Sequence, residues 1–336
     1  MPSKNLPILV LGYGSIAKRH VGNLLSLGYR NISVSDPDDR AFANWSPVKR
    51  IGPVTSACAS EFRIAFICTP TNRHVKDALI CARAGCDLFI EKPLSHTLLG
   101  VDALVRLAKR KKLVAMTACN YRFHPGFRLL EKAVRTKKFG APLTARVVLG
   151  HDLSASRKGV DYRKTYAARA KTGGGVILDS GSHVVDYLQA LFGPVKRVSA
   201  HAGNVSRLKI DAEDYALASL RHTSGVASSI ELDFFSVPKR HVVEIQCERG
   251  RMTWDFPNDR VMLEDGTTKQ LRTIRLYPNA DADERRNDMF LRELRAFLKC
   301  VRSRTPGEGD LTSASSVVQT LEAMKRSAKK NTIVTL

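Results

Sequence analysis

Lys92 is the first residue whose type and position could support chemistry. It lies in Phe89-Ile-Glu91-Lys92-Pro93, where a short apolar run ends in a charged pair. An ammonium group at this point could stabilise negative charge developing on an alcohol oxygen, and could pass a proton. Pro93 could fix the turn that follows, through a cis bond. The alternative is that the charged pair lies in a solvated loop.

A second group combines a histidine with two carboxylates. His183 lies four residues after Asp179 and three before Asp186, so one continuous helix would place all three on the same face. Histidine is a common general base because its pKa lies near neutrality, and a nearby carboxylate can orient its ring. Glycines 173–175 would let the backbone approach a ligand. The alternatives are a capping aspartate with a core histidine, or a metal site. We expect no metal, because no third and fourth ligand cluster is visible.

A glycine-rich segment predicts a nucleotide site. Gly12-Tyr13-Gly14-Ser15-Ile16-Ala17 has the form G-x-G-x-x-A; it follows the apolar run Pro7–Leu11 and opens a helical stretch. In this fingerprint the first glycine permits a tight turn, the second admits a pyrophosphate, and a small third residue allows close packing. The predicted cofactor-binding residues here are Gly12, Tyr13, Gly14, Ser15 and Ile16. The alternative is a glycine turn that only packs.

The type of nucleotide is indicated by Asp36. This residue ends the next apolar run, close to the offset of about 20 residues at which an acid binds the ribose hydroxyls. A carboxylate there repels a 2′-phosphate, which favours NAD. NADP stays open as the alternative, because Arg40 is near enough to accommodate that phosphate.

The elements that must position these residues change in character near residue 120. Before it, short apolar runs alternate with helical patterns, which predicts an α/β domain with a parallel sheet covered on both faces. After it, segments such as 143–150, 215–234 and 241–256 alternate with period two around glycine turns, which predicts an antiparallel sheet within an α+β domain. We therefore expect two domains, 1–120 and 121–336. Residues 257–285 read as irregular, and two helices are expected after them.

Composition limits the class of protein. The 336 residues carry 43% apolar side chains, too many for a mostly disordered chain, and no apolar run approaches the roughly 20 residues that span a bilayer. The N-terminus shows no signal peptide pattern. The seven cysteines include no C-x-x-C pair, so we expect free thiols and a cytoplasmic location. The cysteines are Cys58, Cys68, Cys81, Cys86, Cys119, Cys247 and Cys300.

The net charge of +22 has two interpretations. It could attract an anionic partner, such as a nucleic acid, a membrane surface or a phosphorylated substrate. The favoured interpretation is a basic, solvated surface, because the basic clusters are short and end helical patterns. We therefore expect neither a nucleic-acid nor a membrane partner.

These motifs, taken in order, resemble the Gfo/Idh/MocA oxidoreductase family over about residues 7–335. The resemblance rests on the glycine loop, Cys68-Thr-Pro70-Thr-Asn-Arg-His74, Glu91-Lys92-Pro93, Asn120-Tyr-Arg122-Phe-His-Pro125, and the segment from Gly173 to His183. It implies an N-terminal Rossmann domain and a C-terminal domain with a large, mostly antiparallel sheet. That sheet often forms the oligomer interface, so a homodimer or homotetramer is expected.

The resemblance also implies roles for individual residues. Members oxidise or reduce a carbon of a sugar, cyclitol or nucleotide-sugar with NAD(P). Lys92, Asp179 and His183 match the catalytic positions, with His183 expected as the base and Lys92 as its electrostatic partner. The residues implied to line the cofactor are Thr69, Pro70, Asn72 and His74, with Glu91 and Lys92 approaching the nicotinamide ribose.

The segment 161–169 looks similar to a subgroup associated with surface-polysaccharide and acidic-sugar biosynthesis. An anionic, sugar-type substrate would suit arginines here, since a guanidinium binds carboxylate or phosphate in a bidentate manner. A solvated surface loop is the alternative. The expected substrate-binding residues are Arg122, Tyr162, Arg163, Tyr166 and Arg169. The competing functions are a dinucleotide-binding regulator or redox sensor without turnover, and a nucleic-acid-binding protein.

Overall fold

The computed structural model describes residues 3–42, 48–155, 160–278 and 281–336. The chain forms two compact units: Met1–Asn120 with Phe290–Val318, and Tyr121–Met289 with Gln319–Leu336. No helix in the described ranges is long and apolar enough to cross a bilayer.

The first unit is built on a six-stranded, all-parallel sheet with the order β3-β2-β1-β4-β5-β6. This is the Rossmann order, in which the direction of winding reverses between β1 and β4. Because both faces are covered, the central strands are apolar throughout. The strands are β1 (Ile8–Leu11), β2 (Ile32–Ser35), β3 (Lys49–Arg50), β4 (Ile64–Ile67), β5 (Asp87–Glu91) and β6 (Ala115–Ala118).

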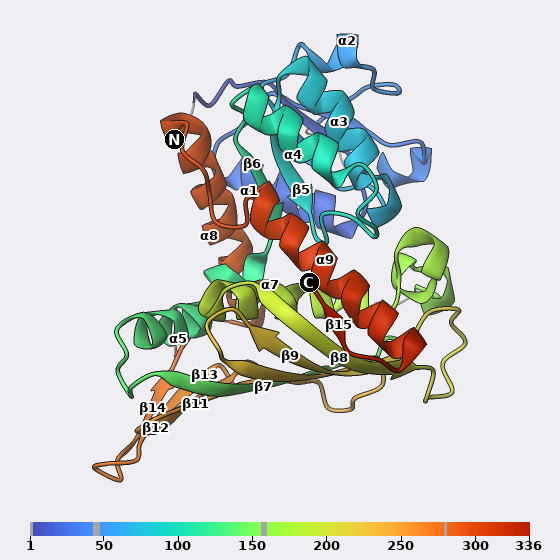
Figure 1. The fold of residues 1–336 in the computed structure, drawn as a ribbon. Helices are drawn as coiled ribbons and strands as arrows, with labels where there is room; N and C mark the ends of the chain where they lie inside the picture. The colour runs from blue at the N-terminus through green and yellow to red at the C-terminus, as the bar shows by residue number, and fades with distance from the viewer. Residues whose placement is uncertain (1–2, 43–47, 156–159, 279–280) are drawn as a thin grey trace. The chain divides into compact units, whose positions relative to one another are not determined.

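Alternate side chains of these strands enter two separate layers. One layer packs Leu9, Ile67 and Leu88 against the helices α2 to α4. Figure 1 shows α3 and α4 side by side. The other contains a cluster of phenylalanine rings and the buried face of helix α1. The helices are α1 (Ser15–Ser26), α2 (Ser56–Ala59), α3 (His74–Ala84) and α4 (Val101–Arg110).

A late part of the chain returns to this first unit. The predicted second domain included every residue after 120. In the structure, however, Phe290–Val318 belongs to the first unit. The reason lies in packing: the Phe297 ring contacts Phe66 and Phe89, with centroids 6.0 and 5.1 Å apart. This segment spans most of α8 (Ala282–Ser303) and the start of α9 (Leu311–Lys330).

The second unit is built on a nine-stranded sheet with the order β14-β13-β12-β11-β7-β10-β9-β8-β15. Every neighbouring pair is antiparallel except β7 and β10, which run parallel. The expected fold class is therefore confirmed for both units. The strands are β7 (Pro142–Gly150), β8 (Val195–Gly203), β9 (Tyr215–His222), β10 (Ala227–Asp233), β11 (Arg240–Cys247), β12 (Gly250–Asp255), β13 (Arg260–Asp265), β14 (Leu271–Arg275) and β15 (Val334–Thr335).

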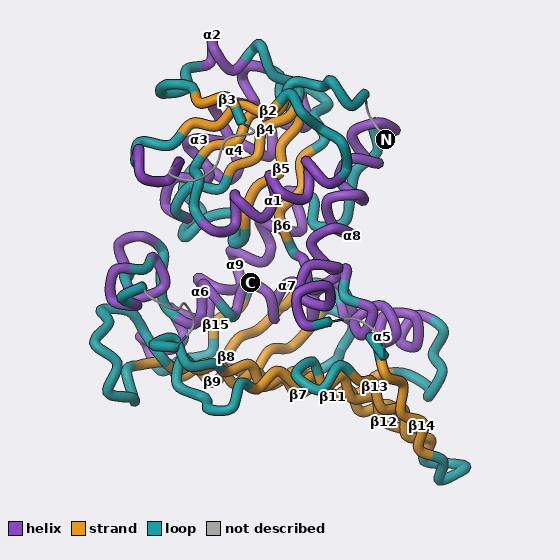
Figure 2. The backbone as a smooth tube through the Cα atoms, turned by 180° about the vertical axis from the view of Figure 1, so that it is seen from behind, coloured by secondary structure: helices purple, strands orange, loops and turns teal. Residues whose placement is uncertain are grey.

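Helices cover one face of this sheet, and along its strands buried side chains alternate with exposed ones. Figure 2 shows α5 (Pro125–Arg135), α6 (Val176–Asp179) and α7 (Gly181–Phe192) on the same side of the strands. Along β9 the side chains of Ala216, Ala218 and Leu220 are buried, whereas the residues between them are exposed. Period two thus gives β9 one buried face and one exposed face.

The interval expected to be irregular contains regular structure. Residues 257–285 hold β13, β14 and the first residues of α8. Leu271–Arg275 has no buried side chain, so β14 lacks the alternation by which a strand is recognised. Pairing with β13 forms it instead.

Candidate functional site

The glycine loop has the geometry that a dinucleotide needs. Gly12 has φ +84°, and a Cβ there would lie 2.7 Å from the carbonyl oxygen of Cys68, so only glycine fits. Gly14 faces open space. No described side chain caps the N-terminus of α1 at Gly14, so its amides are available to an anion.

Asp36 lies directly beside this loop. Its carboxylate accepts hydrogen bonds from the backbone N–H of Tyr13 at 2.6 Å and of Asp38 at 2.8 Å. The carboxylate is therefore fixed at the end of β2, next to the turn that would hold a pyrophosphate. Arg40, the residue that left NADP open, has a side chain outside the described part of the structure.

The other residues of the loop differ in exposure. The Tyr13 ring is buried and stacks on Phe42, with centroids 5.1 Å apart, and burial raises the pKa of its hydroxyl. Ser15 is exposed and Ile16 is half-buried. Tyr13 can therefore offer a cofactor mainly its backbone, whereas Ser15 presents its side chain to solvent.

The turn after β4 is held by a buried histidine. In His74, Nδ1 lies 2.8 Å from the carbonyl oxygen of Pro93, and Nε2 lies 2.8 Å from that of Thr69. Burial lowers the pKa of His74, while the carbonyls and nearby carboxylates oppose that shift. His74 is buried, whereas Pro70, Asn72 and Arg73 of this turn are exposed.

Lys92 follows β5 at the carboxyl edge of the parallel sheet. The preceding residue, Glu91, is buried; its Oε1 lies 2.6 Å from Nε2 of His20, and its Oε2 accepts the backbone N–H of Lys92 at 3.2 Å. The Lys92–Pro93 peptide bond is cis, as expected. Lys92 itself is half-buried.

Asp179 and His183 belong to the second unit and lie on two short, consecutive helices. Helix α6 ends at Asp179 and α7 begins at Gly181, so the expected continuous helix is interrupted at Ser180. The Asp179 carbonyl accepts the hydroxyl of Ser182 at this point. Ser180 keeps helical backbone angles, φ −84° and ψ −41°, so the interruption is local.

The glycines before α6 serve the packing of the protein. A Cβ at Gly174 would collide with the carbonyl groups of Tyr166 and Ala167, and one at Gly175 would collide with the carboxylate of Glu213. At Gly174 and Gly175 the missing Cβ therefore admits neighbouring protein segments, and the approach of a ligand at Gly173 stays a prediction.

His183 packs against Tyr121 at the edge of a cluster of aromatic rings. The ring of Tyr121 lies edge-on to His183 with centroids 4.7 Å apart, and equally close to His241. Trp254 packs against His241 at 5.1 Å. Burial, with smaller contributions from the nearby positive groups Lys239 and His124, holds the pKa of His241 well below its ordinary value.

Arg122 lies in the turn beside Tyr121, but it does not present its charge to solvent. Its guanidinium donates two hydrogen bonds of 2.6 Å to the Asp186 carboxylate, and both residues are buried. Its charge is already neutralised within the protein, and a substrate contact of Arg122 stays a prediction. The pair instead ties the turn Asn120–Phe123 to α7, one turn beyond His183.

The loop 161–169 approaches Asp179 through one residue. The Tyr166 hydroxyl donates a hydrogen bond to Oδ1 of Asp179. Arg163 is exposed and pairs with Asp161 at 2.8 Å, and Arg169 is exposed and donates to the carbonyl oxygen of Arg163 at 3.3 Å. Tyr162 accepts the Lys209 backbone N–H at 3.2 Å.

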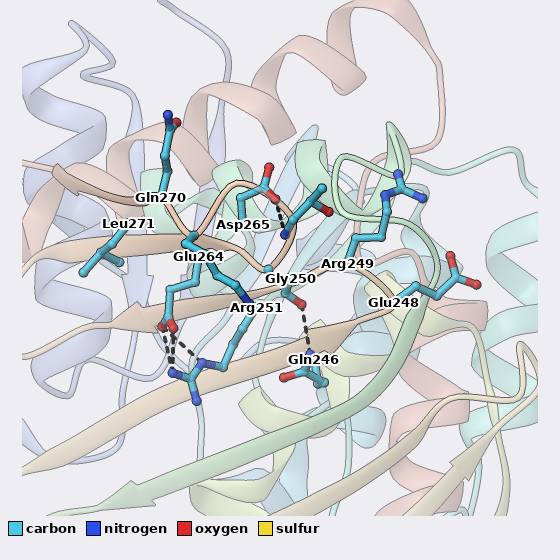
Figure 3. Close-up of a pocket in the computed structure, with 12 residues that line it drawn as sticks. Gln246, Glu248, Arg249, Gly250, Arg251, Glu264, Asp265, Gln270 and Leu271 are labelled. Atoms are coloured by element: carbon cyan, nitrogen blue, oxygen red, sulfur yellow. Dashed lines mark hydrogen bonds and ion pairs between the residues drawn. The ribbon is translucent and has the colours of Figure 1, made fainter.

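A cavity of about 550 Å³ lies at the ends of the hairpins β11–β12 and β13–β14. Figure 3 shows its ion pair between Arg251 and Glu264 and the hydrogen bond from Gln246 to the Gly250 carbonyl. None of the predicted site residues lines it. Among the described residues, no cluster of three His, Cys, Asp or Glu side chains could hold a metal ion.

Sequence reasoning missed two supporting residues. His20 occupies the buried face of α1, where a histidine reads as an ordinary core residue, and Tyr121 shows no periodic signal. Glu91 and His20 are 71 positions apart, so their pairing could not be read from spacing.

Comparisons with known proteins match both units. A family model described as "Oxidoreductase family, NAD-binding Rossmann fold" matches residues 6–119, and one described as "GFO/IDH/MocA C-terminal domain" matches residues 127–253. Myo-inositol 2-dehydrogenase from Thermotoga maritima is 26% identical over 249 residues, covering 71% of this chain and 70% of the relative. D-apiose dehydrogenase from Paraburkholderia graminis is 26% identical over 260 residues, covering 74% and 67%.

Solved structures agree with the fold. Levoglucosan dehydrogenase in complex with NADH superposes with a TM-score of 0.87 at 18% identity, covering 98% of this chain and 99% of that one. A probable dehydrogenase from Thermotoga maritima superposes with a TM-score of 0.78 at 26% identity and the same coverage.

Proposed function

Because the chain belongs to the GFO/IDH/MocA family of oxidoreductases with an NAD-binding Rossmann fold, we propose that it is a dehydrogenase acting on a sugar, cyclitol or nucleotide-sugar. The reaction moves a hydride between the nicotinamide and a carbon that bears a hydroxyl. The observation that carries the proposal is the position of Lys92, directly after β5 at the carboxyl edge of the parallel sheet. Ligands of open α/β sheets bind at this edge.

The catalytic roles fall to three residues. Bound NAD supplies the carbon that accepts the hydride when the substrate C–H bond breaks. His183 takes the hydroxyl proton, and the Lys92 ammonium stabilises the negative charge that develops as that proton leaves. Asp179, hydrogen-bonded by Tyr166, orients the His183 ring.

The cofactor contacts come from the first unit. The backbone of the glycine loop and the N-terminus of α1 suit the pyrophosphate, and Asp36 suits the two ribose hydroxyls. We infer a preference for NAD over NADP, because a second negative charge beside Asp36 would be repelled. The other residues that we propose to line the cofactor are Thr69, Pro70, Asn72 and Lys92.

The substrate class is polyhydroxylated and includes an anionic group. Relatives are named for inositol and apiose, which supports a polyol carbon as the reaction centre. Arg163 and Arg169 are exposed near Tyr166, and their guanidinium groups would suit a carboxylate or phosphate. Without turnover the protein would be a dinucleotide-binding regulator or redox sensor, but Lys92, Asp179 and His183 all favour the enzyme.

Assembly and location complete the proposal. The exposed face of the nine-stranded sheet carries Leu217, and Leu143 and Leu271 are also exposed on its strands, which suits a homodimer or homotetramer formed through this sheet. Light scattering after gel filtration would measure the assembly. All seven cysteines are free thiols, which supports the cytoplasm as the compartment.

The test is a titration with NADH and NADPH at low and high salt, followed by substrate screening. We expect NADH to bind more tightly than NADPH and to remain bound at high salt. Myo-inositol, apiose and nucleotide-linked uronic acids would then be screened with NAD by the absorbance of the reduced nicotinamide. Failure of both nucleotides to bind would overturn the proposal, and binding without turnover of any sugar would favour the regulator.

A further inference from the structure

Two buried histidines that the proposed mechanism does not use lie against the residues on either side of Lys92. His20, on α1, contacts the carboxylate of Glu91. His74, at the start of α3, contacts the carbonyl oxygen of Pro93. Both histidines and both of the residues they contact belong to the first unit.

The His20 contact is the only strong polar contact that its ring makes among the described residues. The ring is fully buried between Phe89, Phe66 and Phe290, with centroids 5.0, 5.9 and 6.2 Å away. Its Nδ1 has no hydrogen-bond partner in the described part of the chain. Nε2–H therefore donates to Glu91, whose other oxygen accepts the Lys92 backbone N–H. A buried carboxylate needs such donors to offset its lost hydration.

The His74 contacts join two turns at the same edge of the sheet. Carbonyl oxygens only accept hydrogen bonds and a neutral ring carries one N–H, so the neutral ring donates to one of the two carbonyls and only the imidazolium donates to both. One of these carbonyls follows Lys92 directly, and the other belongs to Thr69 at the end of β4. His74 thus fixes the Pro93 turn relative to the neighbouring strand.

Lys92 needs this support because it is the first residue beyond the sheet. The ladder between β5 and β6 ends at the pair of Glu91 and Ala118, so no strand bonds fix the chain after it. A misplacement of about 1 Å can cost an enzyme about 100-fold in rate.

We propose that His20 and His74 are positioning residues that hold the Lys92 ammonium in place by fixing Glu91 and Pro93. This inference rests on the proposed function, which assigns Lys92 to the reacting oxygen. It predicts that loss of the Glu91 contact lowers kcat while leaving the KM for NAD within about 3-fold, since the glycine loop is untouched, and that loss of the Pro93 contact of His74 lowers kcat.

A matched pair of variants at His74 tests the inference. The amide of asparagine reaches the Nδ1 position and that of glutamine the Nε2 position, so H74N keeps the Pro93 contact and H74Q keeps the Thr69 contact. We expect kcat to fall about 100-fold in H74Q. In H74N the fall in kcat should be no more than about 10-fold. Equal losses in both variants, or none, would overturn the assignment of His74.

The His20 contact has its own pair of variants. H20Q keeps a donor near Glu91, whereas H20L removes it. We expect H20Q to recover most of the kcat lost in H20L, at similar KM for NAD. Equal kcat in the two variants would overturn the role of His20, provided both show the thermal unfolding midpoint of a folded protein.

Hydrogen exchange separates this inference from the proposed function, because it needs no substrate. Exchange of the peptide that spans residues 88–95 should be faster in H74Q and H20L than in H74N, H20Q and the unmodified protein. If the unmodified protein binds NADH but turns over none of the screened sugars, cyclitols and nucleotide-sugars, the proposed function fails. Unchanged exchange in all variants would overturn the positioning role, whatever the turnover.

Discussion

The segment around Lys92 and the helix that carries His183 are held by different interactions. Lys92 is flanked by two residues in contact with buried histidines, through hydrogen bonds to a carboxylate and to a backbone carbonyl. The helix of His183 is tied by a buried ion pair between Arg122 and Asp186, and the His183 ring rests on Tyr121. The first arrangement fixes a turn and the second fixes a helix, so the two should fail differently when a partner is removed.

The largest expected effects come from the proposed catalytic groups. K92M and H183Q should each lower kcat by about 10²- to 10⁴-fold, because one removes charge stabilisation and the other removes the base. NADH binding should stay within about 3-fold in H183Q, since His183 belongs to the second unit. Stopped-flow turnover and a fluorescence titration would measure the two quantities.

The double variant sharpens this comparison. If both groups serve the same chemical step, the loss in K92M/H183Q should be much smaller than the product of the single losses. Losses that simply multiply would show that the two residues act in separate steps.

The ion pair of the second unit should affect stability more than any contact around Lys92. R122M leaves the Asp186 carboxylate buried without its partner and should lower the free energy of unfolding by about 3–5 kcal/mol. The double variant R122M/D186L removes both charges and should recover much of that loss. Urea unfolding would measure both. A change below about 1 kcal/mol in R122M would show that the pair does not hold α7.

The smallest effect is expected in the free energy of unfolding at acidic pH. Burial holds the pKa of His241 well below its ordinary value, so below about pH 6.5 the unfolded chain binds a proton that the folded chain does not. The stability contributed by neutral His241 is therefore complete above pH 6.5 and decreases by about 1.4 kcal/mol per pH unit below it. In H241N the free energy of unfolding between pH 6.5 and 5 should fall less steeply. Identical slopes in the two proteins would contradict this.

Local patterns predicted most of the fold. The alternation of strand and helix before residue 120 and the hairpin at Gly225 both reflect interactions between near neighbours in sequence, and the structure has them. Strand β14 was missed because all its side chains lie outside the core, so only its partner β13 defines it. The return of Phe290–Val318 was missed because contacts between rings that are far apart in the chain produce no periodic pattern in the sequence.

The site was predicted less completely, for a related reason. The glycine loop and Asp36 follow from residue type and spacing, and the structure brings them together. The partner of Arg122 lies 64 positions away, so the sequence showed an arginine beside a motif but could not show that its charge was already neutralised. His20 and Tyr166 likewise gain their meaning only from distant partners, Glu91 and Asp179.

The late return of Phe290–Val318 to the first unit has a consequence for synthesis. A ribosome releases the six strands of the parallel sheet early, yet Phe66 and Phe89 lack the ring of Phe297 until most of the chain has emerged. We therefore expect the nascent first unit to keep part of its apolar surface uncovered until residues 290–318 emerge. A fragment ending at Asn120 should bind a hydrophobic dye and aggregate, whereas adding residues 290–318 as a separate peptide should reduce both.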